Sequence, residues 1–249
     1  MKKSIIIFVL VIVTVFCICF GSYKHLAGFK SVFKDGSLNI TFDDVDNDYD
    51  NEDEELSNLG KYEIDRKLEK FSSIRIDAAV MGITIEEGDD FKIEGSFNRE
   101  ILKPEISIKN GQLNVIQGKR KSHGINMGSQ NCRMVITIPS GNSLSTIDIN
   151  SNVGDIRLRE ITADEIDVDL NVGEIDIRKV DFIECDCDNN VGEISIIPLS
   201  SLNDYDISAK TDVGEVRVDG RSHKKSYSAR GNGKNKIKAN TNVGEINIK

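Results

Sequence analysis

Basic side chains gather near the end of the chain, where their types and spacing could bind an anion. No Asp or Glu occurs from Gly220 to Val243. Such a group of cations attracts the phosphate or carboxylate groups of polymers and lipid headgroups. We therefore predict an anionic-ligand surface, made by Arg221, Lys224, Lys225, Arg230 and Lys234. A shorter basic insert, from Lys119 to His123, is expected to contribute, and a solvated loop is the alternative interpretation.

Acidic side chains recur at fixed spacing in the same half of the chain. Rows of carboxylates can bind divalent cations, and gathered carboxylates can transfer protons in glycan-cleaving enzymes. One row is Asp155, Glu174, Glu193, Glu215 and Glu245; further acids are Asp167, Asp169, Asp186 and Asp188. The same pattern is typical of solvent-facing turn and strand residues, which is the interpretation we favour. We predict no metal site, no cofactor and no catalytic residue.

Other catalytic arrangements are absent from the sequence. It has no Gly-rich phosphate loop and no Ser-His-acid pattern, and its three His residues are scattered. Cys185 and Cys187 occupy apolar places of a repeated segment, where free Cys acts as a small hydrophobic residue. The sequence therefore does not predict an enzyme.

The elements that position these side chains are repeated strands. Five Val-Gly-acid motifs are spaced by 19, 19, 22 and 30 residues, and their glycines are Gly154, Gly173, Gly192, Gly214 and Gly244. Apolar and polar residues alternate on both sides of each glycine, as in strands. A repeat of about 20 residues with such strands is typical of a solenoid. We predict an all-β fold, a parallel β-solenoid or β-helix-like stack with one N-terminal transmembrane helix.

The turn within each repeat favours stacking over hairpins. Glycine at the third place of Asn-Val-Gly-acid suits a type II turn, which needs a positive φ there. Two-residue hairpins prefer other glycine positions, so each unit is expected to turn a corner and continue. A meander of antiparallel hairpins is the alternative. In a parallel stack we expect a polar ladder along the corners, made by Asn152, Asn171, Asn190, Asp212 and Asn242.

The N-terminal segment predicts a membrane anchor. Lys2 and Lys3 precede an apolar run from Ile5 to Phe20, which is typical of a secretory signal, either cleaved or retained. We favour a retained signal-anchor transmembrane helix over residues 1–22. The two lysines favour a cytoplasmic N-terminus. The predicted localisation is therefore the cell membrane, single-pass, with the C-terminal domain extracytoplasmic.

Residues 23–60 are predicted to be an acidic, disordered juxtamembrane stalk, followed by the β-solenoid domain over residues 61–249. Nine acids and no base lie between Asp43 and Glu55, a composition that cannot bury an apolar core. Removing those nine from the 41 Asp and Glu residues leaves 32, the number of Lys and Arg residues. The rest of the chain is balanced in charge, so we predict no nucleic-acid partner.

From Phe71 to its end, the chain resembles the bacterial putative-adhesin family of unknown function. The residues that carry the resemblance are the Gly-acid-Ile repeats together with Phe71–Ile76, Met81–Ile85, Asn110–Val115 and Met134–Pro139. The resemblance implies an extracytoplasmic domain on an N-terminal anchor, with roles in adhesion or the envelope-stress response. It brings no catalytic residues.

These observations predict a non-enzymatic domain that binds or scaffolds at the bacterial cell envelope. Its expected partners are the membrane, an envelope polymer, anionic lipid or another membrane protein. A regulatory or sensory partner in an envelope-stress signalling system is the alternative, and a glycan-cleaving β-helix enzyme is third. The last repeat ends at Ile248 and Lys249. As the final coil it would leave an open strand edge, through which we predict self-association or partner binding.

Overall fold

The computed structural model describes residues 29–34, 37–42, 60–118 and 132–249. The predicted anchor over 1–22 and the acidic run over 43–55 lie outside these residues. Among the residues described, no helix is long and apolar enough to cross a membrane. Strands β1 (Phe29–Lys34) and β2 (Ser37–Phe42) form an antiparallel hairpin. This part of the predicted disordered stalk therefore has secondary structure.

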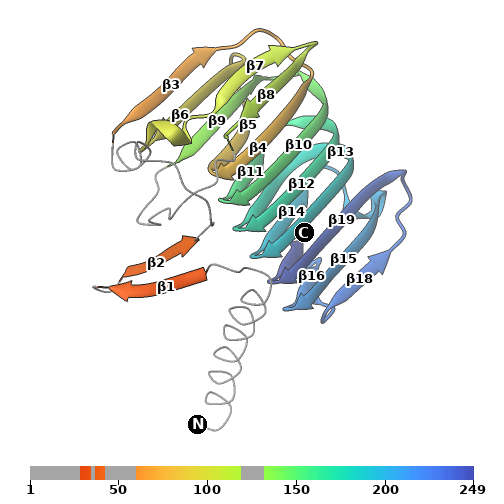
Figure 1. Ribbon diagram of the computed structural model, residues 1–249. Coiled ribbons are helices and arrows are strands. Elements are labelled where there is room, and N and C mark those ends of the chain that lie inside the picture. The colour runs from red at the N-terminus through yellow and green to blue at the C-terminus, as the bar shows by residue number, and fades with distance from the viewer. Residues whose placement is uncertain (1–28, 35–36, 43–59, 119–131) are drawn as a thin grey trace. The chain divides into compact units, whose positions relative to one another are not determined.

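The prediction of an all-β fold is confirmed, since residues 60–118 and 132–249 contain strands and two short 3₁₀ helices, η1 (Glu100–Leu102) and η2 (Leu202–Asp204). The strands stack in two facing sheets (Figure 1). Sheet 1 contains, in spatial order, β7 (Glu105–Lys109), β8 (Gln112–Ile116), β4 (Ser73–Val80), β10 (Ser143–Val153), β12 (Thr162–Val172), the second part of β13 (Ile175–Val191), β19 (Asn235–Val243), β15 (Tyr205–Val213) and β18 (Ser226–Ala229). Sheet 2 contains β3 (Tyr62–Lys67), β6 (Lys92–Phe97), β9 (Arg133–Pro139), β5 (Gly82–Gly88), β11 (Ile156–Arg159), the first part of β13, β14 (Ile194–Pro198), β20 (Ile246–Ile248), β16 (Val216–Val218) and β17 (Arg221–Ser222).

Equivalent strands of the repeats pair in parallel and in register, as predicted. Ile147 of β10 pairs with Ile166 of β12, which pairs with Cys185 of β13. In sheet 2, Ile156 pairs with Ile175 in the same way. The alternative of an antiparallel meander is therefore wrong for the repeats.

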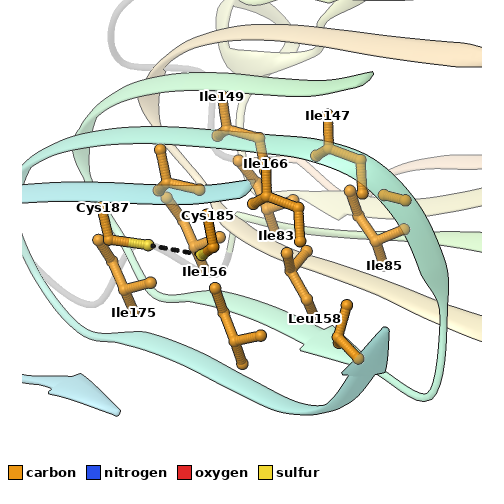
Figure 2. Close-up of a cluster of buried hydrophobic side chains, with 14 of the residues drawn as sticks. Ile83, Ile85, Ile147, Ile149, Ile156, Leu158, Ile166, Ile175, Cys185 and Cys187 are labelled. Carbon is orange, nitrogen blue, oxygen red and sulfur yellow. Dashed lines mark hydrogen bonds between the residues drawn. The ribbon is translucent and has the colours of Figure 1, made fainter. Parts of the chain in front are cut away.

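The core lies between the two sheets and is built from the inward side of every repeat (Figure 2). Alternation places Ile, Val and Leu inward, and most of these side chains have no exposed surface. Each fully buried Ile contributes about 1.5–3 kcal/mol to folding. Cys185 and Cys187 lie in this core, and their sulfur atoms are 3.7 Å apart. The prediction that they are core residues is confirmed.

The glycine corners stack on one another more closely than any side chain would allow. The five repeat glycines have φ between 140° and 153°, so the predicted positive φ is confirmed. The value differs from the roughly 80° of a type II turn, because the chain continues in an extended form into the next sheet. A Cβ added to Gly173 would lie 1.8 Å from the carbonyl oxygen of Gly154. The close stacking therefore requires glycine.

The units do not stack in the order of the sequence. Strands β19 and β20 lie between β13–β14 on one side and β15–β16 on the other. The last repeat is therefore an interior unit, and the one centred on Gly214 is terminal (Figure 1). The predicted open edge at Ile248 is wrong, because β20 is paired on both sides. A simple solenoid, in which each coil follows the previous one, does not describe this arrangement.

Antiparallel segments close both ends of the parallel stack. At one end, β7 pairs with β8 and β6 pairs with β9. At this end the buried side chain of Gln117 bonds to the backbone where the other units have a stacked corner. Its Oε1 accepts from the N–H groups of Ala79 and Val80 at 2.9 and 2.8 Å. Its Nε2 donates to the carbonyl of Leu102 at 2.6 Å. The outermost strands at this end, β3 and β7, are therefore antiparallel to their neighbours.

Candidate functional site

A hairpin formed by residues 219–234, here called the basic hairpin, closes the other end of the stack. The chain reverses at Asp219 and Gly220, whose φ values are 51° and 71°. Strand β17 then pairs with β16, and β18 pairs with β15. The carbonyl groups of Lys224 and Lys225 accept from the N–H groups of Val216 at 2.7 Å and Thr211 at 2.8 Å. The hairpin is therefore held to both terminal strands.

All five predicted cations are exposed on this hairpin or in the connection after it. Arg221, Lys224 and Lys225 belong to β17 and the following turn, whereas Arg230 and Lys234 follow β18. Strand β18 has four residues, which corresponds to about 13 Å. The structure thus brings three of the cations together and places the other two beyond the opposite end of β18.

The five cations have no ion-pair partner among the described residues. None of the ion pairs between described residues involves any of the five. Lys225 instead donates from Nζ to the carbonyl of Asp212 at 2.5 Å. The shorter basic insert from Lys119 to His123 lies outside the described residues. The basic hairpin therefore presents positive charge that a bound anion could neutralise.

One residue of the acidic row anchors the hairpin. The Ser222 hydroxyl donates to the carboxylate of Glu215, and Arg217 pairs with the same carboxylate at 2.5 Å. These two contacts lower the pKa of Glu215. Beside them, the rings of His223 and Tyr227 lie 4.4 Å apart. Glu215 thus helps to hold the basic hairpin, through its contact with Ser222.

The rest of the acidic row lies along the corners. Asp155 pairs with Arg157 at 3.0 Å. Among the described residues, no group of His, Cys, Asp or Glu is arranged to hold a metal ion. The row therefore offers no preformed cation site in the part of the chain that the structure describes.

The predicted asparagine ladder is present along the stacked corners. Asn171 donates to Asn152 at 2.7 Å, and Asn190 donates to Asn171 at 2.5 Å. Asn242 donates to Asn190 at 2.8 Å, because the last unit stacks on the one that contains Asn190. Asp212, in the terminal unit, pairs with Lys210 instead. The repeated Asn therefore has a structural role.

The outward faces of β10, β12 and β13 form an acidic area. Burial, and then the neighbouring carboxylates, raise the pKa of Asp167 and that of Asp169. The next strand supplies a cation, since Lys238 Nζ lies 2.7 Å from Asp186 and 3.6 Å from Asp188. Neighbouring acids also favour the charged form of Lys238 and raise its pKa, chiefly through the hydrogen bond with Asp186. The predicted solvent-facing acids are thus partly paired across strands.

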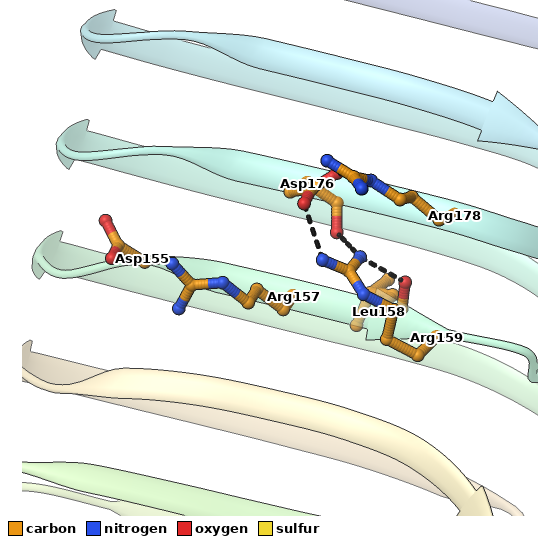
Figure 3. A network of polar contacts seen from close by, with 6 residues as sticks. All are labelled: Asp155, Arg157, Leu158, Arg159, Asp176 and Arg178. Carbon is orange, nitrogen blue, oxygen red and sulfur yellow. Dashed lines mark hydrogen bonds and ion pairs between the residues drawn. The ribbon is translucent and has the colours of Figure 1, made fainter.

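A buried carboxylate on sheet 2 was not anticipated from the sequence. Asp176 is 4% exposed. Its carboxylate accepts hydrogen bonds from Arg159 Nη2 at 2.5 Å and from Arg178 Nε at 2.8 Å (Figure 3). Arg159 also donates to the carbonyl of Asp176 at 2.8 Å. A buried charge is tolerated when it is paired and fully hydrogen-bonded. The signal in the sequence was an acid at a strand position with arginines 17 residues earlier and two residues later.

The described residues do not gather a catalytic group. His223 packs on Tyr227, while His25 and His123 lie outside the described part of the chain. The hydrogen bond with Cys185, together with burial, raises the pKa of the Cys187 thiol, and burial raises that of Cys132. Buried thiols with raised pKa values are poor nucleophiles.

Stacked parallel repeats, glycine corners and antiparallel ends together define an all-β domain of the stacked-repeat class. The chain belongs to the Toastrack DUF4097 family, whose model matches residues 71–200 and, again, 145–249. The resemblance to a putative-adhesin family of unknown function is thereby confirmed.

The fold is similar to that of solved structures, and for one of them the TM-score is above 0.5. One is that of a putative cell adhesion protein from Clostridium sporogenes, with a TM-score of 0.62 and 21% identity, covering 76% of this chain and 99% of that one. A putative adhesin from Bacteroides fragilis has a TM-score of 0.44 and 15% identity, covering 76% of this chain and 97% of that one. At such identity the first likeness shows the fold alone. No curated protein matches the chain.

Proposed function

We propose that this chain is a non-enzymatic binding domain of the bacterial cell envelope and that the basic hairpin is its ligand surface. The ligand is an anionic envelope polymer or an anionic lipid headgroup. The observation that carries the proposal is the group of exposed cations at the end of the stack, with no ion pair to any described carboxylate. The solved structure with a TM-score of 0.62 is named a putative cell adhesion protein, which supports a binding role.

The physical basis of this binding is electrostatic. Each Lys or Arg near an anionic surface contributes about 1 kcal/mol of attraction. Charges are screened over about 10 Å at 0.1 M salt, so cations at one end of the stack act largely independently of the acids elsewhere. The hairpin is held on two strands, so little ordering is needed on binding. A repeated phosphate or carboxylate polymer could contact both groups of cations at once.

Membrane anchoring completes the proposal. Residues 1–22 would hold the chain in the membrane, with residues 61–249 outside the cytoplasm. The test is protease treatment of intact cells that express the full chain with an epitope at Lys249. Loss of the epitope signal without lysis supports this topology, and protection until lysis contradicts it. The regulatory alternative in envelope-stress signalling stays a prediction, for which recovery of a specific membrane partner would be the test.

The binding test compares two variants of equal net charge. One carries Arg221→Gln, Lys224→Gln, Lys225→Gln and Arg230→Gln. The control carries Lys61→Gln, Lys67→Gln, Lys103→Gln and Lys109→Gln, which lie towards the other end of the stack. The probes are soluble poly(glycerol phosphate), phosphatidylglycerol vesicles and phosphatidylcholine vesicles.

We expect the native chain to bind at least one anionic probe at low salt and to release it as salt rises. At about 1 kcal/mol per cation, the hairpin variant should bind at least about 100-fold more weakly. The control variant should lose far less. Equal losses in both variants, or no binding of either anionic probe by the native chain, would refute the proposal. The two anionic probes distinguish a polymer ligand from a lipid ligand.

A further inference from the structure

The last unit in the sequence, residues 235–249, fills a slot inside the stack. In sheet 1, β19 pairs with β13 and β15; in sheet 2, β20 pairs with β14 and β16. At the corner, Gly192 donates to the carbonyl of Val243 at 2.9 Å, and Gly244 donates to that of Val213 at 2.9 Å. The unit thus contributes backbone hydrogen bonds to both of its neighbours.

One short connection joins this unit to the stack before it. Residues 230–234 link β18 to β19 across the end of β15, a distance of two strand spacings or about 10 Å. Five extended residues span up to about 17 Å. The connection includes two glycines that pass close to the Asp204 and Tyr205 backbone. The connection is therefore longer than the distance it spans. When the unit leaves, β15 and β16 stay paired with β18 and β17 but lose their pairing with the stack, which in the described residues runs only through β19 and β20.

Charges on the neighbouring strands match the strand that fills the slot. Lys236 lies in register between Glu184 of β13 and Asp206 of β15, and its Nζ is 3.2 Å from Glu184. Lys238 pairs with Asp186 at 2.7 Å. If β15 closed directly onto β13 in the same register, Asp206 would face Glu184 and Lys210 would face Asp188. The first pair would be repulsive and the second attractive, and both lysine pairs of β19 would be lost. The slot is thus matched to a strand that carries lysines at these two places.

We propose that the slot also accepts residues 235–249 of a second copy, so that two chains exchange their last units. An exchanged unit makes the same hydrogen bonds and ion pairs as the chain's own unit, because every contact described above joins the unit to the slot. Its own unit is favoured only by the short connection, which corresponds to an effective concentration of the order of millimolar. Copies crowded at a surface reach comparable local concentrations. The partner of this surface is therefore a second copy, reached by strand exchange instead of edge pairing.

The experiment uses the full chain with Cys17 and Cys19 replaced by Ser, and the buried native thiols retained. One tagged copy carries Asp186→Cys, and a differently tagged copy carries Lys238→Cys. These positions are direct register partners whose side chains meet in the structure, so a disulfide can form between copies only when the unit of one occupies the slot of the other. The two copies are unfolded together, refolded at high concentration and oxidised. A non-reducing gel reports the doubly tagged product.

The control pair is Asp167→Cys with Lys238→Cys. Asp167 lies one strand beyond Asp186, or about 9.6 Å from Lys238, which is too far for a disulfide. We expect at least tenfold more doubly tagged product with Asp186→Cys than with Asp167→Cys. A single chain that carries both Asp186→Cys and Lys238→Cys should form an intramolecular disulfide, which shows that its own last unit fills the slot. Internal closure without mixed product at any concentration overturns the proposal, as does an equal yield from the two pairs.

Discussion

Replacing Gly173 by Ala tests the corner stacking most directly. The backbone of Gly173 has φ of 144°, and an added Cβ would lie 1.8 Å from the Gly154 carbonyl oxygen. A side chain in such a conformation costs about 1–3 kcal/mol. Relief of the clash must also separate two backbones that Gly154 joins to Val172 by a hydrogen bond of 3.1 Å. Losing one or two such bonds costs about 1 kcal/mol each. We therefore expect Gly173→Ala to lower the free energy of unfolding by about 2–5 kcal/mol.

The measurement is urea unfolding followed by far-UV circular dichroism. Gly141→Ala is the matched control, because Gly141 has φ of 77° and no atom within 4 Å of the added Cβ. The loss of unfolding free energy in this control measures only the cost of a side chain at positive φ, about 1 kcal/mol. If Gly173→Ala is no more destabilising than Gly141→Ala, the corners are not stacked as described.

Three further changes probe other contacts. Gln117→Leu leaves two backbone N–H groups without their acceptor and should cost about 2–4 kcal/mol in urea unfolding; a cost no larger than that of Gln112→Leu would argue against the cap. The pKa of Asp167 is raised above 3.8, so its contribution to stability is present below that value and lost as pH rises through the raised pKa. Asp167→Asn should therefore reduce the loss of stability between pH 4 and pH 7, whereas the same reduction with Asp164→Asn would contradict the assignment. Lys238→Glu should cost about 1–2 kcal/mol at low salt and less at 1 M NaCl, and an effect independent of salt would count against the cross-strand pairs.

The parallel pairing, the core and the asparagine ladder could be predicted from the sequence, because the repeat defines them locally. Each unit keeps the same frame around its glycine, so alternation assigns Cys185 to the core as firmly as Ile166. Register is well specified when one face of a strand is buried. An Asn repeated at one position of each unit then places the side-chain amides of neighbouring units one strand spacing apart.

The order of the units could not be obtained from that local pattern, since every unit offers the same frame to its neighbours. Non-local charges distinguish them. Lys236 matches Glu184 and Asp206, whereas Asp206 against Glu184 would be unfavourable. The open edge expected at Ile248 was wrong for this reason.

The candidate site was partly predictable. The absence of acids after Gly220 indicated a basic surface, and the structure places its cations on a hairpin that closes the stack. The sequence did not indicate that Glu215 would hold β17, because that contact depends on the reversal at Asp219. The buried Asp176 was missed because alternation assigned it to solvent, whereas in the structure it is buried and bound by Arg159 and Arg178. Gln117 was missed because a lone polar residue after a strand carries no pattern.

The interior position of residues 235–249 has a consequence for biosynthesis. A ribosome makes β15 and β16 before β19 and β20, so the growing chain exposes the neighbouring edge of β13 while its final place is still unfilled. Premature closure of β15 onto that edge would give a shorter, incorrectly assembled stack. In that arrangement Asp206 would face Glu184 and Lys210 would face Asp188, so one outward pair would oppose the error and another would favour it. The stack can reach its final order only after the last residues of the chain have been made.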